Sequence, residues 1–576
     1  MSYPDGYTVA TYSQFFKRKI RVNYLSELIN KYDQLEVLNA LSRSNLLIFD
    51  RPKYSSNQNL LVSNFFDRKT INKFINKERK LRRDDAHFAC RLSVFNRIQL
   101  LYLFQKAFLL CISKEKKKEL RLKKVRIRFG KLLLMANELT YEGENIDKRI
   151  EDEKKKYFLL YFLRRYENNN IPNLKHEIVR NNIILNEILN QDDLKEKYDN
   201  LEIDRFFKSE NKVSLLEYLD FIFCVIAILT DRLKHPNSFI NNYSSTRVQK
   251  SNFSKTILKN SVVSNLLKSL SLDTKNFSNK IENDINKSPS YSFLSFRKYP
   301  LFRITKYYYC IDLGFLIEKV CSNIFWKIQD SLPQTYRDRF HAFWGMVFER
   351  YVDSVFERIY KPTSPLSNYY PHPASEKNEE IIDGILNYHN SVIMFEFKSS
   401  FLPINIKFSP DLRAFENEVK KKLKLENFAK KIKKIFIERS LSFNDIDINN
   451  VRKIFPVLIT LERCYQSEFM NWHINNIFNK YLPGNPQIEI FPIQILTIDE
   501  LEYLEPYLEG GFKFCEILQG RLRFDEKMNR PFSYFINNEL RFRPKKSNRH
   551  ISGEYRKWGI QIKKRIFGRE DIQQLD

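Results

Sequence analysis

The stretch DGILNYHNSVIMFEFK (residues 383–398) joins two apolar runs through the polar tetrapeptide YHNS. Runs of β-branched and aromatic residues on both sides of a polar turn predict two paired strands. Because side chains alternate between the faces of a strand, Glu396 and Lys398 project together, while Phe397 points the other way into the core. If the turn folds the first strand back onto the second, Asp383 comes close to Glu396. Two carboxylates and a lysine are therefore predicted to meet at one edge of a sheet.

The segments around this stretch are predicted to alternate between helix and strand. Apolar residues recur at helical intervals before it, and Ser409-Pro410-Asp411 marks the capped start of a long basic helix after it. The order helix, two strands, helix, strand, helix, strand, helix runs over residues 341–360, 379–400, 409–440, 453–462, 466–482, 488–497 and 498–509. This order predicts an α+β or α/β domain whose central mixed sheet is flanked by helices.

The predicted carboxylate pair points to a metal site. Two carboxylates that are buried together resist ionisation, because like charges repel strongly in a medium of low dielectric. Carboxylate oxygens, a backbone carbonyl and water form a hard-oxygen site that suits Mg²⁺ or Mn²⁺. A bound cation lowers the pKa of its water and neutralises charge on a phosphate. Lys398 would hold that water or help to deprotonate it, and would stabilise the developing charge.

These residues resemble a known family. The spacing Asp383…Glu396-x-Lys398 resembles the catalytic motif of the PD-(D/E)XK nuclease superfamily. The preceding helix carries G-x-x-F-E at residues 345–349, which is similar to the glutamate-bearing first motif of many members. The wider layout, with a large helical region before the core, looks like that of bacterial anti-phage defence or restriction nucleases.

The resemblance assigns roles to particular residues. It implies that Glu349, Asp383, Glu396 and Lys398 are the catalytic residues. Asp383 and Glu396 would be metal ligands together with the backbone carbonyl of Phe397, and Glu349 would join the metal site or orient a metal-bound water. The implied cofactor is Mg²⁺ or Mn²⁺.

The resemblance covers about residues 296–510 and implies an αββαβ core, in which Ile454–Leu461 is a further strand. The chain departs from the family pattern in two places. Ile382 precedes the aspartate where many members have proline, and residues 409–438 contain none of the glutamines that some branches place on this helix.

The remainder of the chain divides by composition. From residue 12 to about residue 270 the pattern is mostly helical, and a Ser- and Asn-rich segment follows the last long apolar run. We expect a helical sensor, partner-docking or DNA-positioning region, a linker-like segment, the nuclease-like domain and a basic C-terminal extension, over residues 1–235, 236–295, 296–510 and 511–576.

The charge balance favours an anionic partner. The chain carries 97 Lys and Arg against 69 Asp and Glu, a formal net charge of +28. Such a field attracts polyanions, although the codon bias of an AT-rich genome would also enrich lysine on a solvated surface. Part of the excess lies on residues 114–131, which read as helix or short strand, on residues 409–438 and on residues 521–576. The candidate nucleic-acid contacts are Lys420, Lys421, Lys422, Lys424, Arg541, Arg543, Lys545 and Lys546, with a solvated face as the alternative.

Cysteines and apolar runs favour a soluble, cytoplasmic protein. The seven cysteines are scattered and form no C-x-x-C pair, so a zinc ribbon or a disulfide framework is not expected. The N-terminus shows no secretion signal. The longest apolar run, residues 221–229, is far shorter than the roughly 20 residues that span a bilayer. We therefore expect no membrane association.

Together these patterns predict a Mg²⁺-dependent endonuclease that hydrolyses phosphodiester bonds in nucleic acid, with DNA favoured over RNA. We expect it to be the effector of a bacterial anti-phage defence or restriction system, with an activating protein partner or a homo-oligomer among its interactions. Two alternatives stay open: an RNase on the same core, and a non-catalytic nucleic-acid-binding or scaffold subunit with a degenerate nuclease fold.

Overall fold

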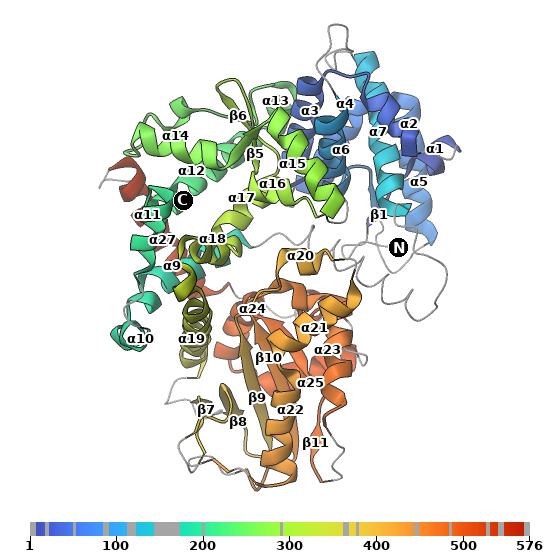
Figure 1. Ribbon diagram of the computed structural model, residues 1–576. Coiled ribbons are helices and arrows are strands. Elements are labelled where there is room, and N and C mark those ends of the chain that lie inside the picture. The colour runs from blue at the N-terminus through green and yellow to red at the C-terminus, as the bar shows by residue number, and fades with distance from the viewer. Residues whose placement is uncertain are drawn as a thin grey trace.

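The computed structural model describes residues 7–17, 22–49, 53–84, 91–111, 123–142, 173–198, 202–287, 292–360, 368–375, 379–409, 411–440, 442–443, 448–482, 487–525, 530–538 and 547–568. Over these residues the chain is a mixed α/β protein in which helices predominate over two mixed sheets and one parallel strand pair. Figure 1 shows a mainly helical body, built from the first half of the chain, above an α/β body that begins with α19 (Gln334–Ile359).

The first part of the helical body packs around one helix that is buried on nearly all sides, α6. Asn96 caps this helix, because its side chain accepts a hydrogen bond from the backbone N–H of Gln99. The elements of this part are β1 (Tyr7–Val9), α1 (Tyr12–Phe16), α2 (Val22–Ile29), α3 (Gln34–Phe49), α4 (Tyr54–Phe65), α5 (Arg68–Asp84), β2 (Arg91–Ser93), α6 (Arg97–Leu110) and α7 (Lys123–Glu142).

The second part of the helical body is organised by α12, the helix that contains the longest apolar run. Ser214 and Glu217 form a reciprocal capping box at its start, which satisfies two otherwise unpaired backbone N–H groups. The helices and 3₁₀ turns of this part are α9 (Leu174–Asn186), η2 (Ile188–Asn190), α10 (Asp192–Lys197), α11 (Ile203–Asn211), α12 (Leu215–Leu233), α13 (Pro236–Asn241), η3 (Lys250–Phe253), α14 (Asn260–Ser269), α15 (Thr274–Lys287), α16 (Leu294–Lys298), α17 (Leu313–Val320) and α18 (Asn323–Ser331).

The described residues of the Ser- and Asn-rich segment, 236–287 and 292–295, are folded, which corrects the expectation of a linker. Its short strands β3 (Arg247–Val248) and β4 (Ser271–Asp273) flank the hairpin of β5 (Leu301–Ile304) and β6 (Tyr307–Cys310) in the sheet order β3-β6-β5-β4. Apolar residues that are spaced between the polar ones, such as Phe253 and Phe277, are buried. The segment therefore belongs to the helical body, and no domain boundary falls near residue 295.

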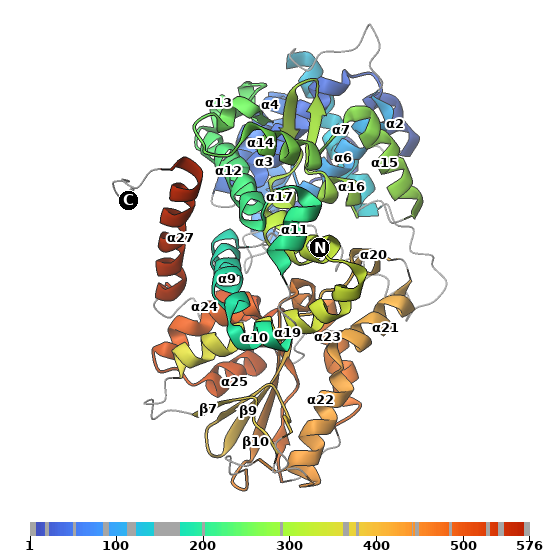
Figure 2. The same ribbon diagram turned by 60° about the vertical axis from the view of Figure 1, so that its left-hand side comes forward.

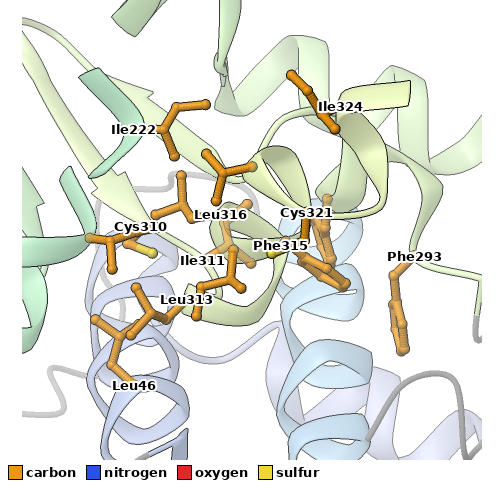
Figure 3. Packing of buried hydrophobic residues seen from close by; sticks show 14 of the residues in the cluster. Leu46, Ile222, Phe293, Cys310, Ile311, Leu313, Phe315, Leu316, Cys321 and Ile324 are labelled. Carbon is orange, nitrogen blue, oxygen red and sulfur yellow. The ribbon is translucent and has the colours of Figure 1, made fainter. Parts of the chain in front are cut away.

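The hairpin leads into α17, and the apolar side chains of this helix lie within the main core. Leu46 of α3, Ile222 of α12 and Cys310 of β6 gather around Leu313 and Leu316 of α17 (Figure 3). All of these side chains are nearly inaccessible to water, so the core connects the first and second parts of the helical body.

A buried ion pair fixes the start of α17. Asp312 caps the helix by accepting the backbone N–H of Phe315 at 2.8 Å. The same carboxylate accepts two hydrogen bonds from Arg97 of α6, at 2.8 Å from Nε and 2.5 Å from Nη2. Gly314 leaves room for this arginine, because a Cβ there would lie 2.7 Å from Arg97 Nη2.

The α/β body contains the large mixed sheet. The strand order is β11-β10-β9-β8-β7, with β12 also paired to β10; β8 is antiparallel to β7 and β9, and the remaining pairs are parallel. The elements are α19, β7 (Asn368–Pro371), β8 (Gly384–Asn387), β9 (Ser391–Lys398), α20 (Ile404–Lys407), α21 (Leu412–Leu423), α22 (Leu425–Ile432), the π-helical turn η4 (Lys433–Ile437), β10 (Lys453–Thr460), η5 (Arg463–Gln466), α23 (Glu468–Asn479), β11 (Glu489–Ile490), β12 (Gln494–Thr497) and α24 (Ile498–Glu509).

Helices cover both faces of this sheet, so the body has three layers. Phe395 and Phe397 of β9 pack into the core formed with α19, α24 and α25 (Phe514–Phe524), and Val392 and Met394 pack against α21, α22 and α23. Figure 2 shows α22 along one side of the sheet. The alternation that the sequence predicts for β9 is therefore confirmed.

The C-terminal segment is folded against both bodies. After α25 come α26 (Phe532–Asn538) and α27 (Arg549–Phe567), which runs along the helical body beside α9 and α12 (Figure 2). Arg565 binds Asp220 through two hydrogen bonds of 2.9 Å. Trp558, which would otherwise be a candidate to stack on bases, packs edge-to-face on Phe223 with 4.9 Å between ring centroids.

No single helix in the described ranges is long and apolar enough to cross a membrane. The helices α11 and α12 reach that length and composition only as a pair that is bent by 63°.

A buried charge cluster joins the two bodies. Arg180 of α9 is 1% exposed and binds Glu502 of α24 at 2.8 Å through Nε and at 3.0 Å through Nη2. It also contacts Asp499, which in turn pairs with Arg463. Tyr351 of α19 donates its hydroxyl hydrogen to the same Glu502 at 2.8 Å. The cluster therefore holds α9, α19 and α24 together.

We predict that Arg180→Ala lowers the free energy of unfolding by about 3–5 kcal/mol, because it leaves buried Glu502 without its main counter-charge. Arg205→Ala is the matched control, since Arg205 is 78% exposed and its removal should leave the unfolding midpoint close to that of wild type. Urea unfolding of both variants, followed by circular dichroism, measures the difference. Equal midpoints for the two variants would contradict the role of the cluster.

Candidate active site

Asp383 and Glu396 are brought together by the strand register. Gly384 pairs with Phe395 in the antiparallel ladder of β8 and β9, so Asp383, one residue before β8, lies beside Glu396. Both side chains are nearly buried, with 8% and 6% of their surface exposed. Asp383 Oδ2 also accepts a short hydrogen bond from the backbone N–H of Phe397. The proximity that the sequence predicts for the two carboxylates is therefore present.

Two lysines bind Glu396. Lys398 Nζ, from the same strand, lies 2.6 Å from Glu396 Oε1. Lys431 Nζ, from α22, lies 3.4 Å from Glu396 Oε2. Both carboxylate oxygens of Glu396 thus have an ammonium partner, and the group lies on the face of the sheet that α22 covers.

Glu349 reaches the same region from the other side. A Cβ at Gly345 of α19 would lie 3.9 Å from the hydroxyl oxygen of Ser399, which follows β9 directly. Glu349 is four residues further on and so occupies the same face of the helix. Among the described residues its half-buried carboxylate forms no hydrogen bond or ion pair. Burial raises the pKa of Glu349, while the positive charges of His372 and Lys398 oppose this effect.

The charges of the site are strongly coupled. Burial, followed by the nearby carboxylate of Glu396, raises the pKa of Asp383 to about 7, although Lys398 and the backbone N–H of Phe397 oppose the shift. For Lys398, burial alone would lower the pKa, but the attraction of Glu396 and Asp383 outweighs it and raises the pKa. The site therefore combines a carboxyl group that gains a proton easily with a lysine that keeps one.

A second cluster of polar side chains adjoins the first. His372 bridges two carboxylates, with Nε2 at 3.0 Å from Asp353 Oδ2 and Nδ1 at 3.1 Å from Glu380 Oε1. These hydrogen bonds raise the pKa of His372 to about 10. Tyr369 donates to Asp353 at 2.5 Å, and the backbone N–H of His372 donates to the carbonyl of Asp383 at 3.1 Å.

The sequence motifs alone miss three residues at this site: Asp353, His372 and Lys431. Asp353 lies four residues after Glu349, so helical periodicity was the signal that could have found it. His372 lies in a turn after β7, and its pairing depends on how that turn folds. Lys431 is one of many lysines on its helix, and only the packing of α22 on the sheet selects it.

The donor set fits a divalent cation. Carboxylates of Asp383, Glu396 and Glu349 and the backbone carbonyl of Phe397 are hard oxygen donors of the kind that Mg²⁺ and Mn²⁺ prefer. The pKa of Asp383 is raised by burial and then by the charge of Glu396, and a bound cation would oppose both effects. Within the described ranges, no group of three or more His, Cys, Asp and Glu side chains is already arranged around a common point.

The predicted basic helix is broken and partly exposed. It consists of α21 and α22, which are separated by Lys424 in the left-handed conformation at φ 49°. Asp411 caps α21 as predicted, by accepting the backbone N–H of Arg413 and of Ala414. Among the candidate nucleic-acid contacts, Lys420, Lys421 and Lys424 are exposed, and Lys422 is half-buried at 3.8 Å from Glu418.

The remaining candidate contacts, Arg541, Arg543, Lys545 and Lys546, lie outside the described residues. Of the basic segment 114–131, the part from residue 123 on is described, and it forms the start of α7, so the helical alternative is the one observed there.

Comparison of the chain with protein-family models, with curated proteins and with solved structures finds no match.

The raised pKa of Asp383 predicts a specific pH dependence of stability. Between about pH 4 and pH 7 the folded protein holds a proton on this carboxyl that the unfolded chain has lost, so the free energy of unfolding falls as pH rises through this window. Each pKa unit corresponds to about 1.4 kcal/mol. We expect Asp383→Asn to remove this fall, so that its melting temperature relative to wild type is higher at pH 8 than at pH 5. Thermal unfolding in EDTA measures the two melting temperatures as a function of pH. A constant difference between the variant and wild type from pH 5 to pH 8 would contradict the prediction.

Proposed function

We propose that this chain is a metal-dependent nuclease of the PD-(D/E)XK type, which hydrolyses phosphodiester bonds in nucleic acid, with DNA as the favoured substrate. The observation that carries the proposal is the pairing of buried Asp383 with Glu396, beside Lys398, at the end of β9. The burial of three charged side chains at the end of a strand costs folding free energy, so such an arrangement is unexpected unless it serves a function.

The order of elements supports the same proposal. A long helix, α19, precedes the hairpin of β8 and β9, and the helices α21 and α22 lead to β10, which lies parallel to β9. Apart from the additional strand β7 between α19 and β8, this order agrees with the αββαβ order that the resemblance implies. Glu349 on the first helix is close enough for its charge to act on Asp383 and Lys398.

Asp383, Glu396 and the carbonyl of Phe397 would hold Mg²⁺ or Mn²⁺, with Glu349 beside them. The N–H and C=O of one residue point to the same side of a strand, so the carbonyl of Phe397 faces the side on which its N–H meets Asp383. A divalent cation in this place neutralises charge on a phosphate and lowers the pKa of a water molecule.

Lys398 would act as a cation, because the surrounding carboxylates keep it protonated. Its ammonium group can donate hydrogen bonds to a scissile phosphate and to the attacking water, and so stabilise charge that develops in the transition state. For that it must leave Glu396 Oε1, which a cation bound to Glu396 would promote by competing for the carboxylate.

The net charge of +28 supports an anionic substrate, since it draws polyanions to the surface. A role as the effector of an anti-phage defence or restriction system rests on the resemblance of the overall layout, in which a large helical region precedes the nuclease-like core.

We predict Mg²⁺-dependent cleavage of DNA that falls at least about 100-fold in Asp383→Asn, Glu396→Gln and Lys398→Met, as expected when a ligand or a charge-stabilising group is removed. Plasmid DNA, single-stranded DNA and total RNA should be compared in the same assay. Glu489→Gln is the matched control, because Glu489 is an exposed carboxylate on β11, and it should cleave like wild type.

Cleavage that survives in all three site variants would exclude the proposed site, and cleavage of RNA alone would assign an RNase. Absence of cleavage under every condition, together with binding of nucleic acid, would favour the non-catalytic alternative.

We further predict that substitution of Lys398 lowers cleavage but leaves metal binding intact. Mn²⁺ should raise the melting temperature of wild type and of Lys398→Met but not of Glu396→Gln, because the lysine is a competitor for Glu396 rather than a ligand. The shift in Lys398→Met should be at least as large as in wild type. Calorimetric scans with and without Mn²⁺ measure this, and a shift that persists in Glu396→Gln would contradict the ligand role.

A further inference from the structure

The helical body contains a polar cavity that is distinct from the candidate active site. Its volume is about 300 Å³, and it lies where the end of α12 meets α13 and strand β3. Its lining is formed by Asp231, Arg232, His235, Ser238, Phe239, Asn242, Ser244, Ser245, Arg247 and Gln249. Two arginines with hydroxyl and amide side chains are unusual for a cavity of this size, since ligand pockets are mostly apolar.

Arg232 is held in place by backbone groups only. Its Nη1 donates hydrogen bonds to the carbonyl oxygens of Ser245 at 3.0 Å and of Arg247 at 2.6 Å. Within the described part of the chain, its Nε and Nη2 donate to no acceptor. The guanidinium is therefore held through Nη1, while the edge formed by Nε and Nη2 has no acceptor within the described part of the chain.

Other arginines of this chain bind carboxylates through the same Nε–Nη2 edge. Arg97 binds Asp312 through Nε and Nη2, and Arg565 binds Asp220 in the same way. A guanidinium edge of this kind matches two oxygens of a carboxylate or a phosphate. At Arg232 the place of the anion is not taken by any carboxylate of the described residues.

Arg247 adds a second cation to the cavity. Its guanidinium lies over the ring of Tyr307, 4.2 Å from the ring centroid, which holds the side chain in place. No carboxylate in the described ranges forms an ion pair with it. Burial, followed by the charge of Arg247, lowers the pKa of Arg232, and the more exposed Asp231 opposes this effect only in part.

The acidic residue nearest in sequence does not neutralise the pair. Asp231 lines the cavity but lies 2.8 Å from Lys234 Nζ. The hydroxyl of Ser245 is also engaged, because it donates to the carbonyl of Phe239 at 2.8 Å. Ser238, His235 and Gln249 remain in the lining as further polar groups. A small ligand with an anionic group could pair with the two arginines, and its polar atoms could form hydrogen bonds with these lining residues.

We propose that this cavity binds a small phosphate-bearing ligand, about as large as a nucleoside monophosphate, whose phosphate oxygens accept hydrogen bonds from the Nε–Nη2 edge of Arg232 and from Arg247. The cavity volume is at the lower end of the range of known ligand pockets, which suits a small molecule better than a polymer. The site does not depend on the nuclease proposal, because it shares no residue with the candidate active site.

The test is isothermal titration of the full-length chain with pyrophosphate, with each of the four common nucleoside monophosphates, with sulfate and with a short single-stranded DNA. Asp383→Asn without Mg²⁺ serves as the parent protein, so that a nuclease activity, if present, cannot degrade the DNA. Arg247→Gln and Arg232→Gln should each weaken binding of a phosphate ligand about tenfold or more, as expected for a lost charge-assisted hydrogen bond. Arg205→Gln, an exposed arginine on the neighbouring helix α11, is the control and should leave binding unchanged.

Arg247→Gln keeps the proposal testable if Arg232→Gln fails to fold, because no hydrogen bond of the Arg247 side chain to the rest of the described chain would be lost. Absence of binding by every phosphate compound at millimolar concentration would overturn the proposal, as would equal binding by the Arg247→Gln variant. Equal affinity for sulfate would indicate an adventitious ion only, and binding of DNA alone would exclude a small ligand.

Discussion

Two carboxylates at the buried end of neighbouring strands are the strongest constraint on the α/β body. Asp383 and Glu396 face each other because β8 and β9 pair in antiparallel register, and little water reaches either. Each needs a positive or hydrogen-bonding partner, since an unpaired charge in such surroundings is very costly. The backbone N–H of Phe397, Lys398 and Lys431 supply these partners from the strand and from α22. The packing of α22 on the sheet is thus tied to the charge of the site.

A comparable arrangement of buried charge joins the two bodies. Arg180 of α9 and Glu502 of α24 are almost fully buried, so in the folded chain each depends on the other, rather than on water, for its hydrogen bonds and counter-charge. The helical body also lies beside the candidate site, because the hydroxyl of Tyr198 contacts Met346, three residues before Glu349. Phe401, just after β9, packs on Phe325 of α18 with 5.2 Å between ring centroids. Residues of the helical body therefore contact both α19 and the segment that follows β9.

The candidate site could be predicted from the sequence because its main residues are local. Asp383, Glu396 and Lys398 lie within one hairpin, where the two-residue period of a strand and the position of the turn determine which side chains meet. Glu349 followed from a motif on the helix before it. Lys431 and His372 could not be found in this way, since each reaches the site through a contact between distant segments. The polar cavity of Arg232 and Arg247 had no sequence signal either, because the two arginines stand 15 residues apart, Arg232 at the end of a helical stretch and Arg247 in the segment that looked like a linker.

The sequence by itself determined the alternation of helix and strand after residue 341, the turn between β8 and β9, and the face to which Glu396 and Lys398 project. These features follow from periodicity and turn chemistry, which act over a few residues. Only the tertiary structure decided that residues 236–287 form part of a folded body, and that α27 returns to pack on the helical body. Polar segments with sparse apolar residues resemble linkers in composition, and they fold only because neighbours far away in the chain cover those few apolar side chains.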